Sequence, residues 1–266
     1  MEDGNKNIMD EFIVETPTIR CDFSLVVKKH QIEEVETLLQ LKSLSSNDCW
    51  NLSTGEVRCN DTSLVTDIML NLLPEYKRTK ILKYKKMHCV ESVMKLKVSC
   101  KWSCLPFIEL NVDLLRFLKD TETMLQISIH EEGDISKNPT MKCNLFLKGP
   151  SLPFELIERI SGKKAVIKRR KGEFPLCTKN YAYAEDFLIF ESEIFDPTLI
   201  QKNATSFYQS FLGDIKGFIQ LETSFVELNI CKSNCSEGIC LETTIPEKMI
   251  DLAEKLGVRI FVGVVP

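Results

Sequence analysis

The stretch between Gly162 and Ile219 constrains the fold of this chain more than any other. It contains a basic segment at residues 163–171, a mostly apolar run at residues 183–195, and then Asp196 followed by Pro197. An Asp side chain accepts hydrogen bonds from the free N–H groups of a first helical turn. Pro is tolerated at the first helical position because it has no N–H of its own and the N–H there would have no partner within the helix. The stretch therefore predicts two strands followed by a helix.

The helix predicted after Pro197 has one apolar side. Apolar residues recur at a spacing of three or four from Leu199 to Ile219, which places them on one face of a helix. Gly213 and Gly217 are the predicted points at which this helix ends or bends. Aromatic residues at helical spacing usually bury against neighbouring elements, so we interpret the stripe as a core face and not as the wall of a ligand site.

The two segments before this helix predict neighbouring strands. Residues 187–194 begin with nearly continuous apolar residues, as in a strand that is buried on both faces. Residues 164–171 have only three apolar side chains among cations, which predicts an edge strand whose charges face water.

Composition places the chain among ordinary globular proteins. It has 266 residues, of which 44% are apolar and 27% charged, and a formal net charge of -4. This charge gives no overall attraction to nucleic acid or to an anionic membrane. The N-terminal residues lack the apolar centre of a signal peptide, and no apolar run approaches the length of a membrane span. We expect an intracellular protein, nuclear or cytoplasmic, with no membrane partner.

The remaining segments predict further strands and helices. Strands are expected at residues 19–27, 89–104, 223–231 and 258–265, and helices at residues 30–44, 63–73, 111–118, 153–160 and 246–255. Residues 77–86 are predicted to form a strand with one solvated side. Two pairings are also expected: an antiparallel pair of residues 124–130 with 141–148, and a hairpin that returns from residue 231 to residues 239–241. The pattern shows no internal repeat.

These elements predict an α+β fold with a mixed, mainly antiparallel sheet and helices packed on it. We expect two lobes that meet near residues 119–123. Residues 1–17 are predicted to be a flexible tail, residues 18–120 the N-terminal α+β lobe and residues 121–266 the C-terminal α+β lobe.

The cysteines suggest a candidate metal site at one turn, and His88, Cys89, Cys100 and Cys104 form a second, looser group. The chain has eleven cysteines, and Cys231, Cys235 and Cys240 are spaced around a predicted turn. Thiolates suit zinc, but a closed structural site takes four ligands and the fourth would come from elsewhere in the chain. In a reducing compartment, buried strand thiols explain such cysteines better. We expect no cofactor.

The sequence offers little support for catalysis. Only three histidines are present, and none stands beside a nucleophile in a recognisable local context. The G-x-S-x-G elbow, the phosphate-binding loop and the dinucleotide-binding glycine pattern are all missing from the sequence. An enzyme whose site has no local motif is one alternative interpretation.

Two basic segments, at residues 77–86 and 163–171, suggest a different function. Their candidate nucleic-acid contacts are Lys77, Arg78, Lys80, Lys163, Lys164, Lys168, Arg169, Arg170 and Lys171. Together they would form a stripe for phosphates, with Tyr181 or Tyr183 available to stack on bases. The alternative is that both segments are solvated edges in a mildly acidic protein.

The favoured interpretation is a non-enzymatic intracellular subunit or adaptor of a larger protein assembly. Its support is the scarcity of catalytic patterns together with many apolar strand segments and free cysteines, which are compatible with surfaces covered by protein partners. A nucleic-acid-binding module that uses the two basic segments is the first alternative.

Overall fold

The computed structural model describes residues 16–44, 49–101, 107–133, 135, 138–174, 181–212, 215–220, 223–232 and 238–265. They form two six-stranded sheets and seven α-helices, so the predicted α+β class is confirmed. Strand pairing in both sheets is mixed and mainly antiparallel, again as predicted. Within the described ranges, none of the helices has the length and apolar character needed to cross a membrane.

Sheet A is built mainly from the N-terminal half of the chain. Its strands are β1 (Thr18–Leu25), β2 (Trp50–Ser53), β3 (Val57–Arg58), β4 (Ser92–Lys101), β6 (Met124–Glu132) and β11 (Cys240–Thr244). Their order is β11-β6-β4-β1-β2, and β3 also pairs with β1. Strands β4 and β6 are parallel, and the other pairs of this sheet are antiparallel.

Sheet B is built mainly from the C-terminal half. Its strands are β5 (Phe107–Leu110), β7 (Thr140–Gly149), β8 (Ile167–Arg169), β9 (Asp186–Glu191), β10 (Phe225–Cys231) and β12 (Arg259–Val265). Their order is β5-β12-β10-β7-β9-β8. Strands β10 and β12 are parallel, and the other pairs are antiparallel.

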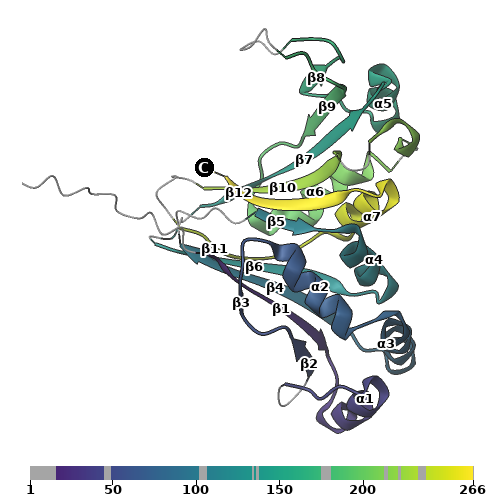
Figure 1. Cartoon of the computed structure of the whole chain (residues 1–266), viewed down its shortest axis with the longest axis vertical. Coiled ribbons are helices and arrows are strands. Elements are labelled where there is room, and N and C mark those ends of the chain that lie inside the picture. Colours follow the sequence, from purple (N-terminus) through teal and green to yellow (C-terminus); the bar gives the residue numbers. More distant parts are fainter. Residues whose placement is uncertain are drawn as a thin grey trace, which may run out of the picture.

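The helices bury one face of each sheet. They are α1 (Ile32–Leu39), α2 (Thr62–Leu72), α3 (Glu75–His88), α4 (Val112–Asp120), α5 (Phe154–Ser161), α6 (Ile200–Gln209) and α7 (Glu247–Leu256). Figure 1 shows most of them on the right of the view, with the strands reaching to the left. Alternate strand residues are buried, as at Ile19, Cys21 and Phe23 of β1. We call the buried side of each sheet its inner face and the opposite side its outer face.

Local sequence signals explain where several helices begin and end. The Asp196 carboxylate accepts from the Thr198 N–H at 2.8 Å, and a short 3-10 turn at Pro197–Leu199 then leads into α6. This helix ends at Gln209, earlier than the apolar stripe predicted, and a second 3-10 turn follows at Lys216–Phe218. Helix α7 ends at Gly257, whose φ of 72° is readily adopted only by glycine. The predicted unit of α7 followed by β12 is present.

The chain contains an internal duplication that the sequence pattern did not reveal. Repeat 1 (residues 18–132) and repeat 2 (residues 140–265) have equivalent helices and strands in the same order, apart from β3, α3 and β8. In place of β3, repeat 2 has a single bridge between Met141 and Phe195. The first strand and helix align without a gap, so that β1 and α1 correspond to β7 and α5. Equivalent positions hold the same residue at Thr18 and Thr140, Cys21 and Cys143, Leu25 and Leu147, Glu33 and Glu155, and Glu36 and Glu158.

Strand register and hydrogen bonds support the duplication independently. Strand β4 pairs with β1 and β6 in the same senses in which β10 pairs with β7 and β12. The Glu36 carboxylate accepts from the Ser43 N–H at 2.6 Å, and the equivalent Glu158 accepts from the Ala165 N–H at 2.8 Å. The prediction that the chain has no internal repeat was therefore wrong.

The two repeats exchange one strand with each other. Strand β5 lies between β4 and β6 in the chain but pairs with β12 of repeat 2. Its equivalent β11 lies between β10 and β12 but pairs with β6 of repeat 1. Each sheet is therefore completed by the other repeat, as in a domain-swapped dimer joined into one chain.

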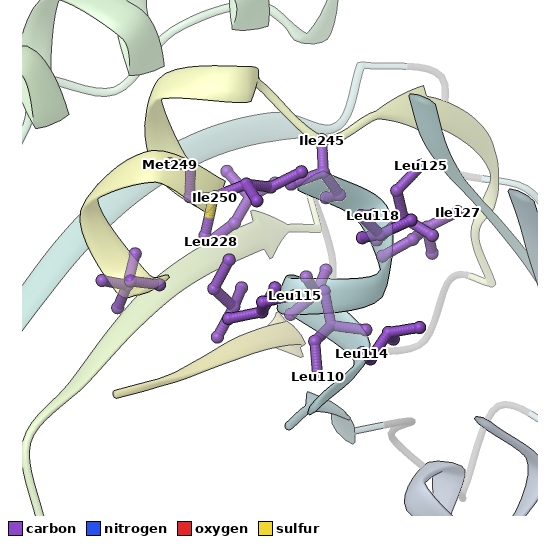
Figure 2. Close-up of a cluster of buried hydrophobic side chains, with 14 of the residues drawn as sticks. Leu110, Leu114, Leu115, Leu118, Leu125, Ile127, Leu228, Ile245, Met249 and Ile250 are labelled. Atoms are coloured by element: carbon purple, nitrogen blue, oxygen red, sulfur yellow. The ribbon is translucent and has the colours of Figure 1, made fainter. Parts of the chain in front are cut away.

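Equivalent residues of both repeats meet in the core between the sheets. Figure 2 shows side chains from α4 and α7 packed together with residues of β5, β6 and β10. Among the residues labelled there, equivalent pairs are Leu110 and Ile245, Leu114 and Met249, and Leu115 and Ile250. A buried ion pair between Glu131 and Lys232, 2.7 Å apart, adds a polar link between β6 and the end of β10.

Helix α3 replaces the strand predicted for residues 77–86. Ile81 and Tyr84 are buried at helical spacing, and α3 contacts α1 and α4. Lys77 and Lys85 are only 8% and 7% exposed. The aliphatic part of a lysine side chain packs in an apolar environment although the residue reads as polar in a sequence pattern.

Two predicted strand pairings were wrong, one because a repeat boundary separates the two strands and one because the repeats exchange a strand. Residues of β6 and β7 form strands as expected, but β6 lies in sheet A and β7 in sheet B. Strands β10 and β11 likewise belong to different sheets and form no hairpin. The predicted lobe boundary between residues 120 and 121 does not coincide with the division between the sheets, since β6 pairs with β4 and β5 pairs with β12.

Candidate functional site

A row of four phenylalanines crosses the outer face of sheet B. The residues are Phe187 of β9, Phe146 of β7, Phe225 of β10 and Phe261 of β12. The Phe146 ring stacks on Phe225 with centroids 4.3 Å apart, and lies 6.1 Å from Phe187. The Phe225 ring meets Phe261 edge-on at 5.0 Å. We call these four residues the aromatic row.

Strand alternation explains why the row faces away from the helices. Leu145 and Leu147 on either side of Phe146 are fully buried on the inner face, whereas Phe146, Phe187 and Phe225 are partly exposed and Phe261 is 8% exposed. Phe146 and Phe225 are directly opposite in the antiparallel register of β7 and β10. Directly opposed aromatic residues on one sheet face stabilise each other, but they also create an apolar surface in contact with water.

The duplication provides an internal comparison for this surface. In sheet A, the positions equivalent to Phe146, Phe225 and Phe261 are occupied by Ser24, Val93 and Gln126. Sheet A has the same strand order and pairing senses around these positions. The fold itself therefore does not require aromatic residues there, and the aromatic row is a feature specific to repeat 2.

A polar cluster adjoins the aromatic row on the same outer face. Asn144 and Asn229 donate their amide N–H groups to the Glu227 carboxylate at 2.8 and 2.9 Å. The side-chain carbonyl oxygens of both asparagines are buried and have no hydrogen-bond partner among the residues that the structure describes. Buried acceptors of this kind are commonly satisfied by an ordered water molecule.

Charged side chains surround the row in matched pairs. Lys142 pairs with Glu191, Lys148 with Glu185 at 3.2 Å, and Arg259 with Glu109 at 2.9 Å. The Arg259 guanidinium also lies 5.3 Å from the centre of the Phe261 ring. Because each of these cations has an acidic neighbour, this part of the outer face has no strong net charge.

The first predicted basic segment lies on α3, where its named residues bind local carbonyl groups. Lys77 donates to the Leu72 carbonyl at 3.4 Å, Arg78 to the Leu73 carbonyl at 2.9 Å, and Lys80 to the Leu38 carbonyl at 3.0 Å. These contacts join α3 to the end of α2 and to α1.

The second basic segment surrounds β8 and pairs mainly with acids of its own repeat. The buried Glu158 carboxylate accepts from Lys164 at 3.3 Å and from Lys168 at 2.8 Å. Arg170 pairs with Asp186 at 2.9 Å, and its guanidinium covers the Phe154 ring at 3.6 Å.

Of the other named residues of this segment, Lys163 lies over the Phe207 ring at 5.3 Å. Arg169 donates to the Lys168 carbonyl at 3.0 Å. The Lys171 N–H donates to Asp186 at 2.8 Å.

The structure separates the two basic segments. Figure 1 places β8 at the top of the view and α3 in its lower half, beside sheet A. Their cations contact different acids and carbonyl groups, as described above. A single continuous stripe formed from residues 77–86 and 163–171 is therefore not present.

The candidate metal ligands are divided between the sheets. Cys231 lies in β10 of sheet B and Cys240 in β11 of sheet A, and Cys235 lies outside the described residues. Within the described part of the chain, no group of three or more His, Cys, Asp or Glu side chains is placed to hold a metal ion.

Three buried titratable side chains have strongly shifted pKa values. Burial raises the pKa of the Cys21 thiol to about 12 and that of the equivalent Cys143 thiol to about 12. Both thiols are therefore protonated at neutral pH and are poor nucleophiles. Hydrogen bonds, first from Lys168, lower the pKa of Glu158 to about 2.

One cavity, of about 580 Å³, lies where the C-terminus of α4 meets the N-terminus of α7. Its charged lining residues are Lys119, Glu122, Glu247 and Asp251, and Lys119 is 3.5 Å from Asp251. The lining contains neither histidine nor cysteine, and its titratable side chains are these four charged residues.

The aromatic row was missed in the sequence because its members come from four strands distributed over residues 146–261. Each phenylalanine stands in an ordinary alternating strand pattern, and only the register of sheet B brings the rings together. Comparisons of this chain with protein-family models, with curated proteins and with solved structures found no match.

Proposed function

We propose that this chain is a non-enzymatic binding subunit that attaches to another protein through the outer face of sheet B. The observation that supports this function is the aromatic row, which repeat 1 replaces with Ser24, Val93 and Gln126. Aromatic residues are enriched at the buried centre of protein interfaces, where polar groups surround them. The paired charges around the row provide such polar surroundings.

The proposed partner is a folded protein that presents an apolar surface edged by polar groups. Matched ion pairs such as Arg259 with Glu109 make the face nearly neutral, so long-range charge does not favour a polyanion.

Site-specific photo-crosslinking tests this proposal. A photoreactive phenylalanine analogue is placed at Phe225, and in a control at Val93, the equivalent residue of sheet A. We expect one predominant protein adduct from position 225 in cells that express the full chain and little of that adduct from position 93. Equal adducts from both positions, or an adduct only with a second copy of this chain, would contradict a dedicated site for a different protein.

Nucleic-acid binding is the competing function, and its support is the local density of cations around β8. Counterion release would make such binding weaken steeply with salt concentration. Because Arg170 also holds Asp186, Arg169→Ala is the cleaner variant for this test. Salt-dependent binding of a single-stranded oligonucleotide that Arg169→Ala weakens about threefold or more would favour this alternative.

A further inference from the structure

The two sheets have four outer edges, and three of them are closed or short. At the β5 edge, the Thr62 hydroxyl accepts from the Glu109 N–H at 2.9 Å and donates to the Glu109 carbonyl at 3.0 Å. At the β2 edge, Asn51 exchanges hydrogen bonds with residues 43 and 44. Strand β8 has three residues, two of them cations, and short charged edges resist pairing with other strands.

The β11 edge differs from these three. The odd-numbered residues along this strand direct their main-chain hydrogen bonds toward β6. At its two ends, the Ile245 N–H donates to the Leu125 carbonyl and the Ile239 carbonyl accepts from the Glu131 N–H. Strand alternation then turns the main-chain groups of Cys240, Glu242 and Thr244 away from β6. Of these, only the Thr244 carbonyl has a partner among the described residues, the Gln201 side chain at 2.9 Å.

The equivalent edge of the other sheet makes this difference informative. Thr244 in β11 is equivalent to Glu109 in β5, where one threonine hydroxyl closes both main-chain groups. Cys240 and Glu242 are exposed, and β11 has neither a proline nor a cation to discourage pairing.

We propose that β11 is a second interaction site, which binds an extended segment of a partner protein as an added strand of sheet A. The partner would form main-chain hydrogen bonds with Cys240, Glu242 and Thr244, the mode of recognition known as strand addition. The cavity of about 580 Å³ adjoins the end of this strand through Thr244 and Ile245, and gives space for one side chain of the segment.

Charge defines the segment further. Three acids, Glu122, Glu247 and Asp251, line this cavity beside Lys119. Glu122 lies 3.4 Å from Lys86 and Asp251 lies 2.9 Å from Lys248, so Glu247 is the lining acid that forms no ion pair among the described residues. Glu242 is a further acid on the edge itself, where it pairs with Lys95 at 2.7 Å. We therefore infer that the segment carries lysine or arginine next to its β-forming residues.

The test uses Glu242→Pro in the full chain. Proline removes the outward N–H of residue 242 and blocks the approach of a new strand, while the bonds to β6 are made by residues 241 and 243. Glu242→Gln is the matched control, because it retains this N–H and removes the charge. Thermal unfolding of both variants establishes that they fold.

The probe is a displayed library of random twelve-residue peptides selected on the wild-type chain. We expect enriched peptides with alternating β-branched residues and at least one cation. They should slow deuterium exchange at the amides of Cys240 and Glu242, bind Glu242→Pro at least tenfold more weakly, and bind Glu242→Gln within about threefold of wild type.

Several outcomes would overturn the proposal. Peptides that bind wild type and Glu242→Pro equally, or a selection that enriches none, would remove the strand-addition site. A dimer in sedimentation that Glu242→Pro dissociates would assign the edge to a second copy. Amides of β11 that are already protected, and that become labile when residues 1–15 are deleted, would assign the edge to the chain's own N-terminal segment.

Discussion

Lys85 stabilises a left-handed turn that exists in repeat 1 without a glycine. Glu122 has a φ of 49°, and Lys85 donates to the Thr121 and Glu122 carbonyls at 2.7 and 2.5 Å. Repeat 2 has Gly257 at the equivalent position, where the same conformation costs little. Burial lowers the pKa of Lys85, yet the ammonium also reaches Ser92 at 2.6 Å, so each of its three donors has an acceptor.

We predict that Lys85→Met destabilises the chain by about 2–3 kcal/mol, because buried carbonyl groups lose a charged donor. Glu122→Gly in the same background should recover about 1 kcal/mol by relieving the left-handed conformation. Urea denaturation of the two variants measures both effects. A loss from Lys85→Met below about 0.5 kcal/mol would show that this lysine is not needed at the turn.

Protonation of Glu158 makes the stability of repeat 2 decrease at acid pH. Its folded pKa of about 2 lies below its ordinary value of 4.5, so the stabilisation is fully present above pH 4.5 and is lost as the pH falls toward 2. We predict that Glu158→Gln costs about 1–2 kcal/mol at pH 7, and that the difference from wild type shrinks between pH 4.5 and pH 2. Denaturation at several pH values measures this difference, and a pH-independent difference would contradict the assignment.

At the scale of elements, local signals were read correctly from the sequence and distant pairings were not. Asp196 before α6 and Gly257 after α7 gave correct helix boundaries because capping depends on neighbouring residues. Helix α3 was missed because its lysines read as solvated charges. The partner strands of β5 and β11 could not be predicted, because pairing between strands of different repeats leaves no pattern in the neighbouring residues.

The edge of β5 depends on one hydroxyl, which gives a prediction at this scale. Thr62→Val removes both hydrogen bonds to Glu109 while keeping the shape of the side chain, and we expect a loss of about 1–3 kcal/mol. Thr62→Ser keeps the hydroxyl and should lose less than half as much. Thermal unfolding compares the two variants. A larger loss from Thr62→Ser than from Thr62→Val would mean that packing of the threonine methyl group, and not the hydroxyl, stabilises this edge.

At the scale of the whole molecule, the sequence did not show the duplication or the aromatic row. Equivalent positions are mostly similar in character but not identical, as with Ile19 and Met141 or Asp22 and Asn144, and connections of unequal length separate them. The aromatic row depends on the order of four strands, which only the assembled sheet defines. The basic segments could be identified from the sequence because their residues are contiguous in the chain.

Strand exchange predicts that the chain tolerates a break between its repeats. A chain cut between residues 133 and 139 should remain one particle, because β5 and β11 each bind the opposite repeat and Glu131 pairs with Lys232. Size-exclusion chromatography of the protease-nicked protein should show one species in buffer and two in strong denaturant. Fragments that separate in buffer would mean that the exchanged strands contribute little to holding the repeats together.

The most direct test of the central claim is the affinity of the crosslinked partner for a variant in which sheet B carries the residues of sheet A. The variant is Phe146→Ser with Phe225→Val and Phe261→Gln, and Ser24→Ala with Gln126→Ala in sheet A is the control. We predict a dissociation constant raised about 100-fold in the first variant and unchanged in the control, with both folded. A dissociation constant within about threefold of wild type in the first variant would contradict the proposal that the aromatic row is the binding surface.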